Sequence, residues 1–225
     1  EKNPEFIAVR QLLADAGVRV PVLHAADVDA GFLALEDLGD ATLLPILNGE
    51  TGDDYYHAAL NQLRRLASLS VADIALPEYS RALLQAELNV FMDWFVNQLL
   101  TTAANDESSD MVAGRQVFTS LSDVLLDNAR AQPQVLVHRD FHSRNLMVLE
   151  DRQLAVIDFQ DAVIGPITYD PVSLLKDCYI AWPRERQLAW LGQHQQSLSE
   201  SGLIAPVSTT TFVRWFDLMG LQRHI

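Results

Sequence analysis

The chain has 225 residues, of which 49% are hydrophobic, and a formal net charge of -14 at pH 7. This length and apolar content suffice for one large domain or two small ones with a sizeable buried core. A charge this negative, without a basic stripe, excludes a nucleic-acid-binding protein, because a phosphate backbone would be repelled.

A single cysteine, Cys178, excludes an internal disulfide and fits a reducing compartment. No apolar run reaches the length of a membrane span or has the pattern of a signal peptide. We therefore expect a cytoplasmic protein without membrane contact.

The N-terminal part predicts a helix followed by a hairpin. The helix is expected over residues 3–17, with Asn3 as the N-cap, Pro4 at the first position and Gly17 at the end. Two short apolar runs, residues 22–26 and 31–35, flank a polar turn and predict a β-hairpin.

The middle of the chain is predicted to be helical. Apolar residues at helical spacing predict helices over residues 53–69, 80–100 and 111–131. In the second helix we expect Trp94 and Phe95 to belong to the core, since aromatic residues at this spacing more often form core than a ligand site. Residues 101–110 are polar and acidic and predict a surface loop.

Short apolar runs with polar ends follow. Residues 135–137, 146–149 and 154–157 predict a strand, a loop and a second β-hairpin, with Asn145 at one end of the hairpin and Asp158 at the other. Cross-strand neighbours lie about 5 Å apart, so these side chains could share a metal ion. Asp140, in the loop before the hairpin, can face the same space. Amide and carboxylate oxygens suit Mg²⁺ and suit Zn²⁺ poorly.

The C-terminal part predicts a loop over residues 164–169 and helices over residues 171–182, 184–200 and 209–224. The last helical pattern reaches Ile225 without a cap, and the chain begins with Glu1 rather than methionine. We therefore expect a sequence that is truncated at both ends. The order of elements supports an α+β architecture in which a short α/β piece joins a mostly helical part.

The polar stretch around the second hairpin resembles a known superfamily. His138-Arg139-Asp140 followed by Asn145 is similar to the protein-kinase catalytic loop H-R-D-x-x-x-x-N, and Asp158-Phe159-Gln160 resembles D-F-G with its glycine replaced. The run H-R-D-F-H-S-R-N-L resembles the aminoglycoside phosphotransferase and choline kinase branch of the kinase-like superfamily. Within this branch, E-D-L-G-D at residues 36–40 and D-F-Q-D-A-V-I-G-P-I-T-Y-D at residues 158–170 resemble the bacterial anomeric kinases for N-acetylmuramate and N-acetylglucosamine of cell-wall recycling.

The resemblance implies a protein-kinase-like fold. Under this interpretation residues 1–38 are a remnant of the N-terminal lobe, and residues 39–225 are the helical C-terminal lobe with the catalytic hairpin. A hinge joins the two lobes. The Gly-rich hairpin that normally precedes such a helix does not occur in the sequence.

The resemblance also implies roles for individual residues. Asp140 is expected to accept the proton of the substrate hydroxyl, and Asn145 and Asp158 to hold the Mg²⁺ that bridges the phosphates of ATP. The backbone of Glu36 and Leu38 is expected to contact the adenine edge, so their side chains matter less than the extended geometry.

The sequence suggests further roles for the other residues of this stretch. Arg144 is a candidate for binding phosphate or a substrate carboxylate, or is a solvated loop charge. Asp161 is a candidate for binding a sugar hydroxyl or a second metal ion, or caps a helix. His142, a further candidate for substrate binding, stands where a protein kinase has a phosphate-contacting lysine. His138 is expected to support the loop from behind. Asp170 is expected either to cap a helix or to brace the catalytic loop.

The expected function is ATP- and Mg²⁺-dependent transfer of a phosphate to the anomeric hydroxyl of an amino sugar. One alternative is the phosphorylation of an aminoglycoside or another small alcohol, which the acidic composition would favour. Remoter alternatives are a kinase-like binding module without activity and a metal-dependent hydrolase whose ligands are His138, Asp140, His142 and Asp158. The partner is expected to be a small molecule, and the sequence predicts no oligomeric state.

Overall fold

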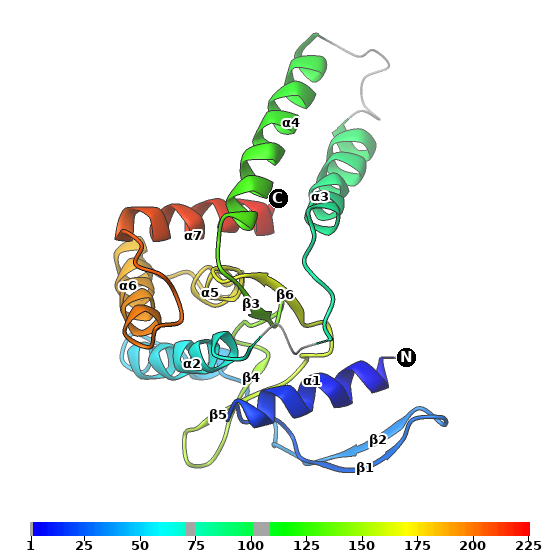
Figure 1. The fold of residues 1–225 in the computed structure, drawn as a ribbon, viewed down its shortest axis with the longest axis vertical. Helices are drawn as coiled ribbons and strands as arrows, with labels where there is room; N and C mark the ends of the chain where they lie inside the picture. Colours follow the sequence, from blue (N-terminus) through cyan, green and yellow to red (C-terminus); the bar gives the residue numbers. More distant parts are fainter. Residues whose placement is uncertain (1, 71–74, 101–108) are drawn as a thin grey trace.

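The computed structural model describes residues 2–70, 75–100 and 109–225 (Figure 1). Helices make up most of this part of the chain, and its strands form three separate two-stranded antiparallel sheets, β1–β2, β3–β6 and β4–β5. The α+β class expected from the sequence is therefore confirmed. Most of the surface loop predicted over residues 101–110 lies outside the described residues. No helix among the described residues is both long and apolar enough to cross a membrane.

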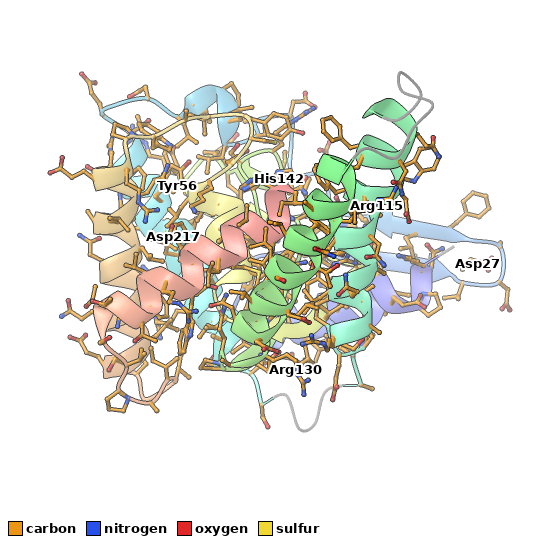
Figure 2. The ribbon with its side chains drawn as sticks, turned by 90° about the horizontal axis from the view of Figure 1, so that it is seen from above. Asp27, Tyr56, Arg115, Arg130, His142 and Asp217 are labelled. Carbon is orange, nitrogen blue, oxygen red and sulfur yellow. The ribbon has the colours of Figure 1, made fainter. Side chains whose placement is uncertain are left out.

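Helix α1 (Asn3–Asp15) packs beside the hairpin of β1 (Leu23–Asp27) and β2 (Phe32–Leu35). The helix starts at Asn3 itself, because the Phe6 N–H already bonds the Lys2 carbonyl at 2.9 Å, so the prediction that Asn3 is the N-cap is wrong. The hairpin projects from the body of the molecule, with Asp27 near its tip (Figure 2).

A group of helices that pack against one another lies on the other side of the molecule (Figure 1). Helix α2 (Gly52–Ala67) follows a short 3₁₀ turn, η1 (Leu44–Ile46), and buries the apolar face that its spacing predicts. Helices α6 (Arg184–Glu200) and α7 (Thr209–His224) begin and end where the sequence predicts. Figure 2 shows α7 beside α4, against which it packs.

The fourth helix of this group, α5 (Tyr169–Leu175), is shorter than the helix predicted over residues 171–182 and starts two residues earlier. The chain leaves the helix where Asp177 turns its carboxylate to local and loop donors. This carboxylate accepts the Tyr179 N–H at 2.9 Å and the Ser143 N–H at 2.9 Å. A side chain that satisfies backbone groups in this way competes with a continued helix.

The single helix predicted over residues 80–100 changes its geometry halfway. α3 (Arg81–Val90) is an α-helix that buries Leu84, and the chain continues from Phe91 to Leu100 as a π-helix, η3. A π-helix has wider turns than an α-helix, so the side chains after Phe91 rotate off the buried stripe. Trp94 and Phe95 are 62% and 46% exposed, and the expectation that they belong to the core is wrong. α4 (Ser109–Arg130) returns antiparallel to this segment (Figure 1).

A strand replaces the loop that the sequence predicts over residues 164–169. β6 (Val163–Pro166) pairs antiparallel with β3 (Gln134–Val137), although Gly165 and Pro166 favour a loop. Pro166 sits at the end of the strand, where a missing N–H is tolerated. A Cβ on Gly165 would lie 3.2 Å from two atoms of Tyr79, so glycine lets that ring pack directly against the strand.

The central hairpin, β4 (Leu146–Val148) and β5 (Leu154–Val156), is confirmed. Its two outer edges are also occupied by backbone. The Val148 N–H bonds the Ala41 carbonyl at 2.7 Å on one side, and the Val156 N–H bonds the Arg19 carbonyl at 2.8 Å on the other. The chain that leaves α1 and the chain that follows residues 36–40 therefore both lie against this hairpin.

Candidate active site

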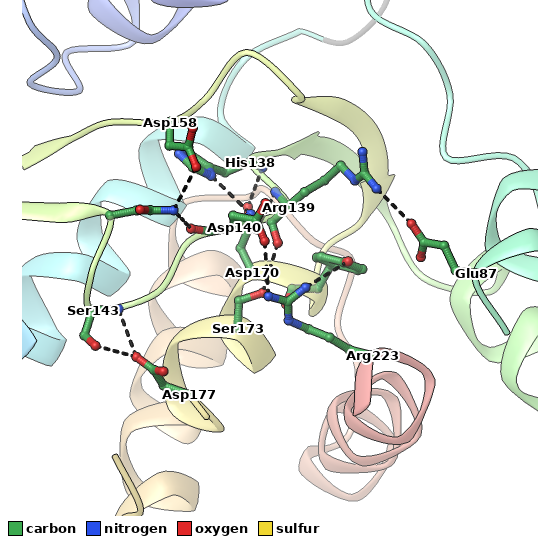
Figure 3. Close-up of polar contacts among 12 residues, drawn as sticks. Glu87, His138, Arg139, Asp140, Ser143, Asp158, Asp170, Ser173, Asp177 and Arg223 are labelled. Atoms are coloured by element: carbon green, nitrogen blue, oxygen red, sulfur yellow. Dashed lines mark hydrogen bonds and ion pairs between the residues drawn. The ribbon is translucent and has the colours of Figure 1, made fainter. Parts of the chain in front are cut away.

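The polar ends of three strands meet at one place, as their positions in the sequence predict. Asn145 immediately precedes β4 and Asp158 follows β5, and the Asn145 amide donates to an Asp158 carboxylate oxygen at 3.3 Å (Figure 3). The same amide donates to the Asp140 carbonyl at 3.0 Å. The loop after β3 is thus fastened to the open end of the hairpin, with the amide and the Asp158 carboxylate side by side.

Two residues of this site have left-handed backbone conformations. Arg139 has a φ of 78° and Asp158 a φ of 65°. Aspartate tolerates this region, whereas for arginine it is uncommon. Such strained residues persist only where surrounding contacts hold them and are concentrated at functional sites. Gln160, which replaces the glycine of the D-F-G pattern, donates its amide to Asp158 at 2.8 Å and helps to hold that carboxylate.

Asp170 braces the loop from below. Its carboxylate accepts the backbone N–H of His138 at 2.7 Å and that of Arg139 at 3.0 Å. Complete burial raises its pKa to about 7, against the opposing effect of the two backbone donors. The alternative that Asp170 caps a helix is wrong, because α5 already includes it and Thr168 occupies the N-cap position.

His138 lies behind the loop as a neutral side chain. Its Nε2–H donates to the Ile157 carbonyl at 3.0 Å, and its Nδ1 accepts the Asp140 N–H at 3.3 Å. Burial lowers the pKa of His138 to about 4. Both ring nitrogens are therefore occupied, and neither is available to a metal ion.

The hydrolytic metal site that we considered is wrong for this reason. Among the residues that the structure describes, no group of three or more His, Cys, Asp or Glu side chains could hold a metal ion. Asn145 and Asp158 offer one amide and one carboxylate, a small set of hard oxygen donors. Such a pair fits Mg²⁺ when the remaining positions are filled by phosphate oxygens and water.

Asp140 opens onto a cavity. One of its carboxylate oxygens lies 3.4 Å from a terminal guanidinium nitrogen of Arg223, whose other terminal nitrogen donates to the Tyr169 hydroxyl at 3.1 Å (Figure 3). The cavity has a volume of about 620 Å³, a size typical of small-molecule sites. It is lined by Glu87, Val90, Phe91, Trp94, Phe95, Arg139, Asp140, Tyr169, Gln222, Arg223 and Ile225.

The sequence does not single out most of these lining residues. Arg223 lies on the last helix, far from Asp140 in the chain, and nothing in its local spacing marks it. Glu87 pairs with Arg139 at 2.8 Å and accepts a hydrogen bond from the Tyr79 hydroxyl, but its spacing on α3 is that of an ordinary exposed helix position. The exposed aromatic residues of η3 carried the only available signal, and the helical spacing assigned them to the core.

The three residues predicted to contact the substrate lie outside the cavity beside Asp140. Arg144 stacks on the Tyr179 ring with 4.8 Å between its guanidinium carbon and the ring centroid, and His142 packs edge-on against the same ring. Asp161 pairs with Lys2 of the N-terminal segment. None of the three lines the cavity beside Asp140. The helix-capping alternative for Asp161 is also wrong, since the next element is strand β6.

Glu36 and Leu38 lie along a second cavity of about 580 Å³, between residues 36–41 and the turn of the β4–β5 hairpin. The Glu36 N–H donates to the Val22 carbonyl at 2.8 Å and closes the first hairpin. The Glu36 side chain forms a two-pronged pair with Arg19, which lowers its pKa to about 2. Of the Glu36 backbone groups, only the carbonyl can therefore face a ligand.

The chain was compared with known families, curated proteins and solved structures. The profile of the Phosphotransferase enzyme family matches residues 1–207. A protein named N-acetylmuramate/N-acetylglucosamine kinase from Pseudomonas putida is 41% identical over 220 residues, which are 98% of this chain and 62% of that protein. A protein of the same name from Neisseria meningitidis is 40% identical over 212 residues, covering 92% of this chain and 61% of that protein. The chain thus spans about three-fifths of the length of these relatives.

Solved structures share the fold at low sequence identity. An aminoglycoside phosphotransferase solved with GDP and kanamycin superposes with a TM-score of 0.65 at 18% identity, covering 98% of this chain and 72% of that one. An ethanolamine kinase from Plasmodium vivax gives a TM-score of 0.65 at 11% identity, covering 99% of this chain and 64% of that one. The protein-kinase-like architecture expected from the sequence is confirmed.

Proposed function

Because the chain belongs to the phosphotransferase enzyme family, we propose that it takes part in catalysing phosphate transfer from ATP. The γ-phosphate would go to the anomeric hydroxyl of N-acetylmuramate or N-acetylglucosamine. The observation that carries the reaction type is the meeting of Asp140, Asn145 and Asp158 beside a cavity large enough for one sugar. The two relatives at 40% and 41% identity support the substrate.

Asp140 acts on the acceptor hydroxyl in this proposal. Its carboxylate lies at the wall of the cavity, where it can accept a hydrogen bond from a sugar hydroxyl and then its proton. Phosphoryl transfer depends more on positioning and charge neutralisation than on covalent chemistry, and a carboxylate held by a braced loop supplies the positioning. Arg223 of α7, 3.4 Å from this carboxylate, would orient it.

Asn145 and Asp158 would hold Mg²⁺ through the amide and carboxylate oxygens. Held there, Mg²⁺ would supply the positive charge that offsets the negative charge of the phosphates. Gln160 holds the Asp158 carboxylate in place. His138 donates a hydrogen bond to the carbonyl of Ile157, the residue between β5 and Asp158, and so fixes the backbone there.

The adenine would lie against residues 36–38. Because the Glu36 N–H already donates to Val22, its contact with adenine would use the carbonyl oxygen, with the Leu38 backbone as the neighbouring contact. Residues 1–38 would belong to the smaller lobe and residues 39–225 to the larger, helical lobe.

The test is a coupled assay of ADP release by the complete protein with ATP and Mg²⁺. N-acetylmuramate, N-acetylglucosamine and kanamycin are offered in parallel, and Asp140→Asn is the control for chemistry. We expect turnover with the amino sugars that the variant loses while it still binds ATP. Turnover with kanamycin alone would keep the reaction and replace the substrate. If none of the acceptors is turned over and ATP does not bind, the chain belongs to a kinase-like binding module.

A further inference from the structure

The cavity beside Asp140 has an aromatic wall, which consists of Phe91, Trp94 and Phe95 of η3. Trp94 is 62% exposed although it is one of the largest apolar side chains in the protein. Burying such a ring is favourable, so a ring left open at a cavity marks a surface that a ligand can cover. The π-helical geometry is what places these side chains off the buried stripe of α3, and π turns are frequent at functional sites.

The charged side chains that line the cavity are those of Glu87, Arg139, Asp140 and Arg223, and together they are called the charged wall. The two carboxylates each have an arginine partner. Glu87 pairs with Arg139 at 2.8 Å, and Asp140 lies 3.4 Å from Arg223. The charges of this wall therefore balance, in contrast to the strongly negative chain as a whole.

A balanced wall selects against polycations. An aminoglycoside carries several ammonium groups, which gain affinity from carboxylates that have no cation of their own. In this cavity an ammonium group would have to compete with a guanidinium for each of the two carboxylates. A ligand of low charge meets no such competition and can place an apolar face on the aromatic wall.

We propose that Trp94 determines acceptor specificity, by packing its exposed ring against one face of a single N-acylated sugar whose anomeric hydroxyl points to Asp140. This inference rests on the proposed function and adds the residue that selects the sugar. A pyranose ring has one face of C–H groups, and the N-acetyl group adds a methyl. The sugar can therefore contact the aromatic wall with its apolar face and form hydrogen bonds to the charged side chains with its hydroxyls.

The kinetic test compares Trp94→Ala and Trp94→Phe with the wild-type protein. Loss of the ring should raise the KM for N-acetylglucosamine about tenfold, the effect of an aromatic contact of this kind, with changes below about twofold in kcat and in the KM for ATP. Trp94→Phe should recover most of the affinity. Val117→Ala, which removes another exposed apolar side chain from α4 outside this cavity, is the matched control and should change none of these values.

A binding measurement gives a readout besides activity. Titration of the nucleotide-free protein with N-acetylglucosamine should change the tryptophan fluorescence, and the change should disappear in Trp94→Phe although the other three tryptophans remain. This experiment also serves if Trp94→Ala does not fold, because phenylalanine keeps an aromatic ring in the wall.

The failures are distinguishable. A wild-type protein that phosphorylates neither amino sugar refutes the proposed function. A protein that phosphorylates them with the same KM in Trp94→Ala, or whose fluorescence response survives in Trp94→Phe, refutes the role of Trp94 alone. Kanamycin turned over as efficiently as the sugars refutes the selection by the balanced wall.

Discussion

The carboxylate of Asp170 holds the backbone N–H of His138 at 2.7 Å, and through it sets the start of the loop that presents Asp140. The second oxygen holds the Arg139 N–H at 3.0 Å, at the residue with a φ of 78°. A helix residue 31 positions downstream of Arg139 thus fixes the strained backbone next to the proposed catalytic base.

Removal of this brace should damage both stability and catalysis. Asp170→Ala leaves the buried His138 N–H and the partly buried Arg139 N–H without an acceptor, at a cost of up to about 1–3 kcal/mol each, and Asp170→Asn keeps one acceptor and should lose less. Urea unfolding measures the free energy, and the ADP-release assay should show a fall in kcat. Asp217→Ala, which removes the partly exposed ion pairs of Asp217 with Lys176 and Arg184, is the control and should cost less than Asp170→Ala. Equal losses in Asp170→Ala and Asp217→Ala would mean that the brace contributes nothing of its own.

Asp158→Asn tests the proposed metal pair. Loss of the charged oxygen should raise the Mg²⁺ concentration for half-maximal turnover by about 10- to 100-fold, with little change in thermal stability. Asp161→Asn is the matched control, because Asp161 is close in sequence but pairs with Lys2 and not with Asn145. Unchanged Mg²⁺ dependence in Asp158→Asn would remove this residue from the metal site.

Two glycine substitutions should have opposite effects on stability. Gly165→Ala puts a Cβ 3.2 Å from the Tyr79 ring and its Cβ, which should cost about 1–3 kcal/mol because the strand and the ring must separate. Gly114→Ala lies in helix α4, where nothing stands within 4 Å of the added Cβ, and should stabilise by about 0.5–1 kcal/mol. Urea midpoints that move in the same direction for both variants would contradict the packing argument.

Stability should fall on acidification because of His194. Burial lowers its pKa from 6.5 to about 4, so between these values the unfolded chain binds a proton that the folded chain does not. Its contribution is complete above pH 6.5 and is lost as the pH falls toward 4, a change of about 3 kcal/mol in the free energy of unfolding. His194→Leu should remove this part of the pH dependence, whereas His24→Leu at the exposed first hairpin should leave it. Parallel pH curves for wild type and His194→Leu would exclude His194 as the cause.

The sequence predicts the parts of this molecule that depend on local spacing. Helices α6 and α7 are separated by clear breaks at Gly202 and Pro206, and both ends of each helix were predicted. The β4–β5 hairpin was also predicted, because its two short apolar arms surround one obvious polar turn. Asn145 and Asp158 follow directly from the register of that hairpin.

Features that depend on distant partners were missed. Strand β6 forms because β3 pairs with it. Gly165 on its own favours a loop, and its role in the strand depends on the Tyr79 ring that packs against it. Arg223 reaches Asp140 across the fold, where no sequence spacing could show it. The switch from α to π geometry at Phe91 likewise leaves no mark in the apolar pattern, and for that reason Trp94 was assigned to the wrong side of its helix.

One outer edge of the β4–β5 hairpin ties it to the N-terminal helix. β5 is hydrogen-bonded to Arg19, just past the end of α1, and Phe6 of α1 stacks on Phe159 with ring centroids 4.7 Å apart. α1 is thereby coupled to the segment that carries Asp158. A displacement of α1 would therefore be transmitted to Asp158 along two routes, the Phe6–Phe159 ring contact and the hydrogen bond between Arg19 and β5.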